Sequence, residues 1–419
     1  MSALVIVVLC LAAPAWASDV LLQNVVIYDG SGGKPYHGDV RIKGDRIAAV
    51  GKHLKPENGE AVRDEHGLAL SPGFIDMHSH ADRGIFEDLN AESVVRQGIT
   101  TVVVGQDGDS DYPLADFLGK LDKTPAAMNV ASMVGQGTLR EQVMGHDYLR
   151  PSSPEELAKM EELLKHEMQA GAFGLSTGLE YDPAHFSTTG EVVDLSKIAA
   201  SYGGFYISHV RDEGDKVFDS FHELMEIGQR AHLPVEITHI KLATTPVWHM
   251  ASTRMPQLFT QAKKDHIQLW ADVYPYTFWQ STIRVIILDH DYFNPEKVAK
   301  AIAENGGADH IRVTRYEPEP AMGGKTLDEI AKAWNITPVD AYMRIVKATL
   351  PGPDGKAPDE GVIVTSMSED DVRWFIADPR ITFCTDGSLH DKHPRGAGSF
   401  AILSTSAICW RMPSSIAGW

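Results

Sequence analysis

The sequence predicts an α/β protein whose main domain is a TIM (β/α)8 barrel. Its 419 residues are enough for a large barrel. From residue 71 onward, apolar strand-like runs alternate with helical stretches such as Pro154–Ala170 and Lys216–Ala231, a pattern typical of parallel βα units. A doubly wound open sheet fits less well, because no glycine-rich phosphate loop follows the first strand. Eight strand runs, the number that closes a barrel, can be followed in order: Phe74–Met77, Thr100–Val104, Val130–Val134, Phe173–Ser176, Phe205–Ser208, Val235–Thr238, Gln268–Val273 and Ile381–Cys384.

A small β domain is predicted ahead of the barrel, over residues 18–70. Short apolar or β-branched runs at Val20–Tyr28, Val40–Ile42 and Arg46–Val50 are separated by glycine-containing turns, which indicates a β meander. The barrel itself is expected over residues 71–400. Between its last two strands, residues 288–378 contain helical segments of their own, and an insertion of that size usually covers a barrel's active site.

The first 17 residues are typical of a signal peptide. An apolar run from Leu4 to Ala13 precedes Ala15-Trp16-Ala17, a small-x-small cleavage site, although no Lys or Arg stands before the run. Cleavage before Ser18 would send the protein to the periplasm or the medium. Cys10 would leave with the peptide, and Cys384 and Cys409 alone are too few for a disulfide framework.

Composition excludes two classes of partner. The formal net charge is −19, and Lys and Arg are interspersed without a basic stripe. Long-range repulsion therefore opposes binding to nucleic acid or to anionic membranes. After signal cleavage no apolar run is long enough to span a bilayer. A small-molecule substrate fits better.

Candidate metal ligands stand at the ends of the predicted strands, where the chemistry of a TIM barrel is found. His78 and His80 follow the first strand, and residues at i and i+2 of an extended chain point the same way. His209 follows the fifth strand, His239 the sixth and Asp386 the eighth. Imidazoles and carboxylates are the usual zinc ligands, and convergence on one barrel axis is hard to explain as packing.

Two aspartates have further possible roles. Asp386 could take a proton from a metal-activated water and return it to a leaving amine. Asp107, just past the second strand, could bridge two metals, or could fix the backbone of its glycine-flanked loop. A competing motif is Gly174–Gly178, which matches the G-x-S-x-G pattern of serine hydrolases. A serine triad would leave the strand-end histidines without a common purpose.

The segment Ser71–His80 resembles the first-strand signature of the amidohydrolase superfamily. More narrowly, the chain is similar to the N-acyl-D-amino-acid deacylases (D-aminoacylases) over Val20 to Phe400. The motifs that carry this resemblance are Thr100–Gly108, Gly174–Pro183, Ser208–Gly214, Thr238–Lys241, Asp272–Tyr276, Met367–Val372, Thr385–Gly387 and His393-Pro394-Arg395.

The resemblance implies a barrel with a small β-sandwich built from both chain ends, and a centre of one or two Zn²⁺ ions. It implies hydrolysis of N-acyl-D-amino acids, in which metal-activated water attacks the acyl carbonyl and Asp386 is the general acid/base. By position, His78, His80, His209, His239 and Asp386 take the places of the metal ligands. Tyr181, Lys241 and Ser281 take places that contact the substrate.

Two departures from the family pattern leave alternatives open. The family has a cysteine where this chain has Asp107, so the number of metals is not fixed by the resemblance. Residues 401–419 contain a single charged residue, Arg411, and match no family element, which predicts a truncated sandwich and poor solubility. A dipeptidase or cyclic amidase of the same superfamily, or an inactive truncated product, would also be consistent with the sequence.

Overall fold

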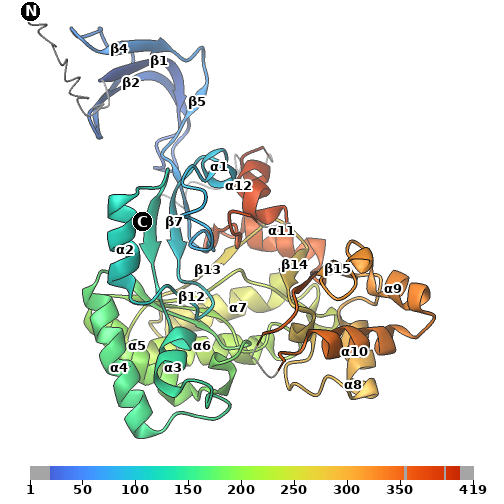
Figure 1. Ribbon diagram of the computed structural model, residues 1–419. Helices are drawn as coiled ribbons and strands as arrows, with labels where there is room; N and C mark the ends of the chain where they lie inside the picture. Colours follow the sequence, from blue (N-terminus) through green and yellow to red (C-terminus); the bar gives the residue numbers. More distant parts are fainter. Residues whose placement is uncertain (1–18, 353–355, 391–392, 406–419) are drawn as a thin grey trace, which may run out of the picture. The chain divides into compact units, whose positions relative to one another are not determined.

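The computed structural model describes residues 19–352, 356–390 and 393–405, which form two compact units divided after Pro72 (Figure 1). The predicted signal peptide, Cys10 and Cys409 lie outside the described residues, so export and cleavage remain predictions. In the described part of the chain, no helix has both the length and the apolar character needed to cross a membrane.

The first unit is a single five-stranded sheet. It contains β1 (Val20–Ile27), β2 (Tyr36–Lys43), β3 (Arg46–Gly51), β4 (Ala61–Asp64) and β5 (Ala69–Leu70). The first three strands form the predicted antiparallel meander, but β4 and β5 both pair in parallel with β1. Val25, Ile27 and Val40 form its buried centre. Most of the atypical tail from which a truncated sandwich is predicted, residues 401–419, lies outside the described residues, so that prediction stays a prediction.

The second unit contains the predicted barrel strands, all parallel, and each of the eight predicted runs contains strand residues. They are β6 (Phe74–Asp76), β7 (Ile99–Val104), β8 (Asn129–Ser132) continued by β9 (Val134–Gly135), β10 (Gly174–Gly178), β11 (Phe205–His209), β12 (Val235–Ile237), β13 (Leu269–Val273) and β17 (Ile381–Phe383). The ring closes where the segments after β17 and β6 meet: Asp386 N donates to His78 O at 2.8 Å, and His80 N to Gly387 O at 3.0 Å.

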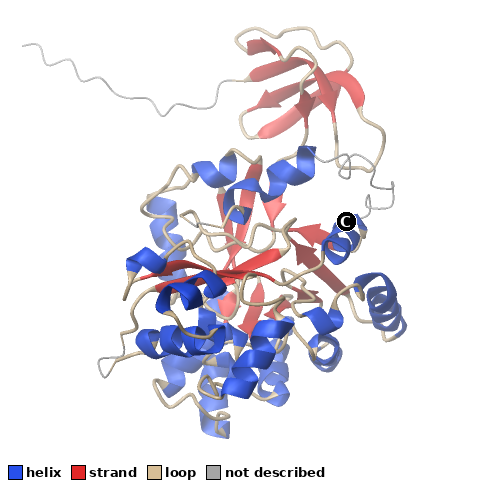
Figure 2. Ribbon diagram, turned by 90° about the vertical axis from the view of Figure 1, so that its right-hand side faces the viewer, coloured by secondary structure: helices blue, strands red, loops and turns tan. Residues whose placement is uncertain are grey.

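Helices surround these strands (Figure 2). They are α1 (Glu92–Val95), α2 (Leu114–Lys123), α3 (Gln136–Met144), α4 (Pro154–Gln169), α5 (Thr189–Ser201), α6 (Val217–Ala231), α7 (Ala251–Lys264), α11 (Glu369–Ala377) and α12 (Arg395–Thr405). In α4, Ser153 and Glu156 form a capping box and Pro154 occupies the first turn, so the chain starts the helix where the sequence predicts it. Helix α12 continues past residue 400, the predicted end of the barrel.

The insertion between β13 and β17 is a small α/β layer with its own hydrophobic core. It contains β14 (Phe278–Ser281), β15 (Ile311–Tyr316) and β16 (Glu360–Thr365), antiparallel in the order β14-β16-β15, together with α8 (Pro295–Glu304), α9 (Leu327–Trp334) and α10 (Pro338–Thr349). Ile311, Ile330, Ile345 and Val362 are among its fully buried residues. We call residues 278–365 the insert.

The insert differs from the predicted boundaries of 288–378 at both ends. Strand β14 opens it at Phe278, earlier than expected, because this strand pairs with β16 rather than continuing the barrel. Helix α11 lies within the predicted range but packs against α7 and β17, and is therefore a barrel helix. The three strands of the insert were not foreseen from its helical pattern.

Candidate metal centre

The structure brings the predicted strand-end ligands together at one end of the barrel. His78 Nε2 lies 3.5 Å from both Asp107 Oδ1 and Asp386 Oδ1. His80 Nε2 lies 3.3 Å from Asp107 Oδ2 and 3.4 Å from Asp386 Oδ1. His239 Nε2 lies 3.3 Å from Asp107 Oδ1. Asp107 therefore turns its two oxygens toward different histidines, as a bridging carboxylate would.

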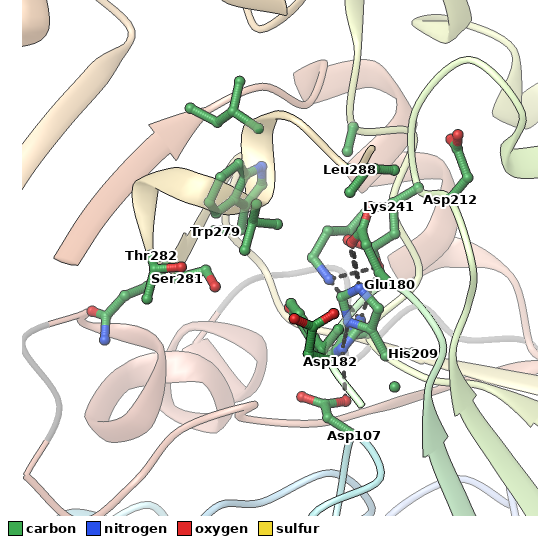
Figure 3. A pocket seen from close by; sticks show the side chains of 18 of the residues that line it. Asp107, Glu180, Asp182, His209, Asp212, Lys241, Trp279, Ser281, Thr282 and Leu288 are labelled. Atoms are coloured by element: carbon green, nitrogen blue, oxygen red, sulfur yellow. Dashed lines mark hydrogen bonds and ion pairs between the residues drawn. The ribbon is translucent and has the colours of Figure 1, made fainter. Parts of the chain in front are cut away.

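His209 joins the group through the nitrogen nearer its backbone. Its Nδ1 lies 3.0 Å from His239 Nε2, while its Nε2 contacts Glu180 Oε2 at 2.6 Å (Figure 3). A carboxylate on one ring nitrogen fixes the imidazole's orientation and leaves the other nitrogen available as a ligand atom. Glu180 thus holds His209 with Nδ1 facing the centre.

The donor set fits a metal ion. His78 is fully buried, and among the described residues neither of its ring nitrogens has a hydrogen-bond partner. A buried polar atom without a partner is costly, and a cation among these side chains would remove that cost. Mixed imidazole and carboxylate donors suit zinc and its neighbours in the first transition row. Two groups of donors have the required spacing: His78, Asp107, His239 and Asp386, and His209, Glu213 and His239.

Both central carboxylates are held in the ionised form that binds metals. Burial alone would raise the pKa of Asp386, but Arg395, His239 and His80 outweigh it and hold the pKa well below the usual range. Burial likewise opposes ionisation of Asp107, and His78 and His239 lower its pKa well below the usual range.

Three of these residues have the left-handed backbone that non-glycine residues rarely adopt: Asp107 (φ 55°), His239 (φ 35°) and Asp386 (φ 48°). Two buried carboxylates from neighbouring strands hold the last two in place. Asp272 Oδ1 on β13 accepts from His239 N at 2.6 Å. Asp76 on β6 accepts from Thr385 N at 2.8 Å and from the Thr385 hydroxyl at 2.5 Å. The barrel interior thus fixes the direction in which each ligand leaves its strand.

The sequence did not point to three residues that orient the candidate ligands: Glu180, Glu213 and Arg395. Glu213 Oε1 lies 3.2 Å from His239 Nδ1 and accepts from Lys241 Nζ at 2.9 Å. Arg395 donates to Asp386 Oδ2. All three belong to motifs that carried the family resemblance, Gly174–Pro183, Ser208–Gly214 and His393-Pro394-Arg395, so a signal was present, but it assigned them no role.

The predicted substrate-contacting residues face the same space. Tyr181, Lys241 and Ser281 all line a cavity of about 900 Å³, as do His80, Asp107, His209, His239 and Asp386. Figure 3 shows Lys241 and Ser281 together with Asp107 and His209. The Tyr181 ring lies 4.4 Å from the His209 ring, between centroids. Lys241 is buried and already paired with Glu213. Ser281 comes from β14, so the insert forms part of the wall.

The serine-hydrolase alternative does not fit the geometry. Ser176 lies within the regular strand β10, is fully buried, and donates from Oγ to Gly105 O at 2.6 Å. A nucleophile elbow would instead expose its serine at a sharp turn after a strand. Ser176 therefore joins neighbouring barrel segments.

The parallel barrel and the donors at its strand ends define a TIM-barrel enzyme with a metal centre. A profile of the amidohydrolase family matches residues 61–347. The chain is 31% identical to the D-aminoacylase of Alcaligenes xylosoxydans xylosoxydans, over 91% of this chain and 77% of that one. Its identity to the N-acyl-D-glutamate deacylase of the same organism is also 31%, with the same coverage.

Among solved structures, the chain resembles the N-acyl-D-glutamate deacylase of Bordetella bronchiseptica complexed with zinc and a phosphonate inhibitor. The TM-score is 0.80 at 26% identity, over 95% of this chain and 83% of that chain. The protein belongs to the amidohydrolase family.

Proposed function

We propose that this protein hydrolyses the amide bond of N-acyl-D-amino acids at a zinc centre. The observation that carries the proposal is the convergence of four histidines and two carboxylates at one end of the barrel, five of them lining one cavity, in a chain similar over most of its length to D-aminoacylases. The proposed ligands share a position at the carboxyl ends of barrel strands: His78, His80, Asp107, His209, His239 and Asp386. When bound, the ion supplies Lewis-acid chemistry, polarising the scissile carbonyl and acidifying water.

Asp386 is the proton carrier of this proposal. Its Oδ2 accepts from Arg395, whereas its Oδ1 faces His78 and His80 at 3.5 and 3.4 Å. Oδ1 is therefore the oxygen that takes a proton from the attacking water and passes it to the leaving nitrogen. Arg395 fixes the carboxylate and keeps it ionised between turnovers.

Two buried side chains orient the substrate. Burial raises the pKa of the Tyr181 hydroxyl well above its usual value, so Tyr181 keeps its proton and can donate a hydrogen bond to the acyl carbonyl oxygen. Lys241 keeps its charge because Glu213 compensates its burial, and its ammonium can pair with the substrate carboxylate. Ser281 contributes a hydroxyl from the insert.

A substrate panel with metal analysis tests the proposal. N-acetyl-D-amino acids, their L enantiomers, dipeptides and cyclic amides are offered to the purified protein. Hydrolysis of the D-amides together with bound zinc supports the proposal. Turnover confined to dipeptides or cyclic amides would assign the chain to another activity of the same superfamily.

The variant Asp386→Asn tests the proton carrier. It keeps the shape of the side chain and removes the base, so kcat should fall by at least ~100-fold, while KM changes far less. A variant with the parent kcat would remove Asp386 from the mechanism.

A further inference from the structure

The wall that the insert contributes to the cavity contains a group of apolar side chains among polar ones such as Gln280, Ser281 and Thr282. Trp279 on β14, and Val285, Ile286 and Leu288 just after it, line the cavity. Figure 3 shows Trp279 and Leu288 as part of this lining. Trp279 is held in place by its ring N–H, which donates to Ser366 Oγ at 2.7 Å. We call these four residues the apolar wall.

The cations that line the same cavity are already paired with carboxylates. Lys241 pairs with Glu213 at 2.9 Å, and Arg395 pairs with Asp386. Two more exposed cations are also paired: Arg315 with Asp359 at 2.8 Å, and Lys300 with Glu304 at 3.0 Å.

The two remaining cations of the lining, Arg83 and Lys216, add no unpaired positive charge to the buried part of the cavity. Arg83 pairs with Asp109 at 3.2 Å, and Lys216 is exposed to solvent. Carboxylates outnumber cations along the lining, because it also holds Asp107, Glu141, Asp182 and Asp212. Within the described residues, the buried part of the cavity therefore offers no cation that lacks a carboxylate partner.

From these two features we propose that the enzyme selects N-acyl amino acids whose side chain is uncharged and apolar, and rejects those of glutamate and aspartate. This inference rests on the proposed function, in which Lys241 takes the α-carboxylate. Lys241 is itself paired with Glu213, so the α-carboxylate shares that cation. A second carboxylate would lose its hydration, would meet only cations whose charge a carboxylate already offsets, and would face other carboxylates. An aliphatic or thioether side chain instead leaves water for the apolar wall.

The first test compares kcat/KM for N-acetyl-D-leucine and N-acetyl-D-methionine with kcat/KM for N-acetyl-D-glutamate and N-acetyl-D-aspartate. The apolar substrates should be preferred by at least ~100-fold, the scale on which a site rejects a polar group that it cannot pair. An equal or greater kcat/KM for the acidic pair overturns the inference but leaves the deacylase proposal standing. If no N-acetyl-D-amino acid is hydrolysed, the proposed function fails, and this inference with it.

A variant that introduces a positive charge tests whether the apolar wall is the source of the preference for apolar side chains. Leu288→Arg places a cation there and should narrow the leucine-to-glutamate ratio at least ~10-fold, by raising glutamate turnover as well as lowering leucine turnover. Leu288→Gln, uncharged and similar in size, is the matched control and should only lower leucine turnover. Zinc content and circular dichroism identify a variant that fails to fold, and Ile286→Arg is the second variant for that case. If neither Leu288→Arg nor Ile286→Arg raises the turnover of N-acetyl-D-glutamate, the apolar wall does not contact the side chain of the substrate, and the inference is wrong.

A third experiment determines whether the apolar wall contacts the amino-acid side chain or the acyl group of the substrate. N-acetyl- and N-hexanoyl-D-leucine are compared with N-acetyl- and N-hexanoyl-D-alanine in the parent and in Leu288→Ala. The inference expects the leucine-over-alanine preference to shrink several-fold in the variant, at either acyl length. A loss that follows acyl length instead would assign the wall to the acyl chain and contradict the proposal.

Discussion

The two sides of the cavity are built on different principles. On the barrel side, buried charged groups face one another: histidines face Asp107 and Asp386, Lys241 pairs with Glu213, and Arg395 with Asp386. On the insert side, the apolar wall stands among polar side chains, and the lining rests on a separate hydrophobic core. The barrel side fixes the chemistry through backbone positions at strand ends. The insert side can change its side chains without moving a metal ligand, so selectivity can vary while the reaction stays the same.

The largest expected effect is on the barrel side. His239→Ala and His209→Ala each remove a proposed ligand, and the remaining carboxylates then lie close together with less positive charge among them. Bound zinc and activity should both fall to near zero, as measured by elemental analysis and by turnover. Leu288→Ala is the matched control on the insert side and should keep its full zinc content. Full zinc and turnover in either histidine variant would show that the proposed ligand set is wrong.

A smaller effect is expected from Asp272, which binds no substrate and holds His239 by its backbone. Asp272→Ala leaves His239 N without its acceptor and releases a backbone at φ 35°. Zinc affinity should fall by ~10–100-fold, the usual cost of losing a group that orients a ligand. Asp272→Asn keeps an acceptor oxygen and should recover most of that affinity in a chelator competition. If the asparagine variant binds zinc as weakly as the alanine variant, charge rather than backbone positioning is the role of Asp272.

The sequence predicted the barrel side well, for a physical reason. Parallel strands bury both faces and appear as continuous apolar runs, and their carboxyl ends must meet at one rim. The polar residues that directly follow those runs, such as His78 and His239, could therefore be placed together without a structure. Glu180 and Glu213 follow predicted runs too, but at least three residues separate each of them from its run, Phe173–Ser176 and Phe205–Ser208. Which way a loop side chain turns depends on tertiary contacts.

The insert and the small sheet were predicted less well. Strands β14, β15 and β16 are short and antiparallel, and the helical periodicity of α8, α9 and α10 dominates that stretch of sequence. In the first unit, β4 and β5 both return to the edge of β1 that β2 leaves open, which depends on pairings between residues distant in the chain. No local pattern distinguishes such a parallel return from one more antiparallel turn.

The smallest expected effect belongs to the insert side and depends on pH. Glu360 on β16 is buried and accepts from Ile283 N at 2.9 Å. Burial raises the pKa of Glu360 from its usual value of 4.5 to about 7. Because the folded protein holds this proton more tightly than the unfolded chain, the free energy of unfolding falls as pH rises between those two values.

Replacing Glu360 by glutamine tests this fall in the free energy of unfolding with rising pH. Glu360→Gln keeps an acceptor for Ile283 N and never ionises. It should stabilise the protein by about 1–3 kcal/mol at pH 8 and by almost nothing at pH 4, where the parent carboxyl is also neutral. Thermal unfolding of both proteins across this range, with zinc content checked throughout, gives the comparison. A difference in stability that does not change with pH would mean that Glu360 does not titrate in this window. A loss of zinc from the variant at a pH where the parent keeps its zinc would mean that the insert and the metal ligands are coupled. That result would contradict the independence inferred for the two sides of the cavity.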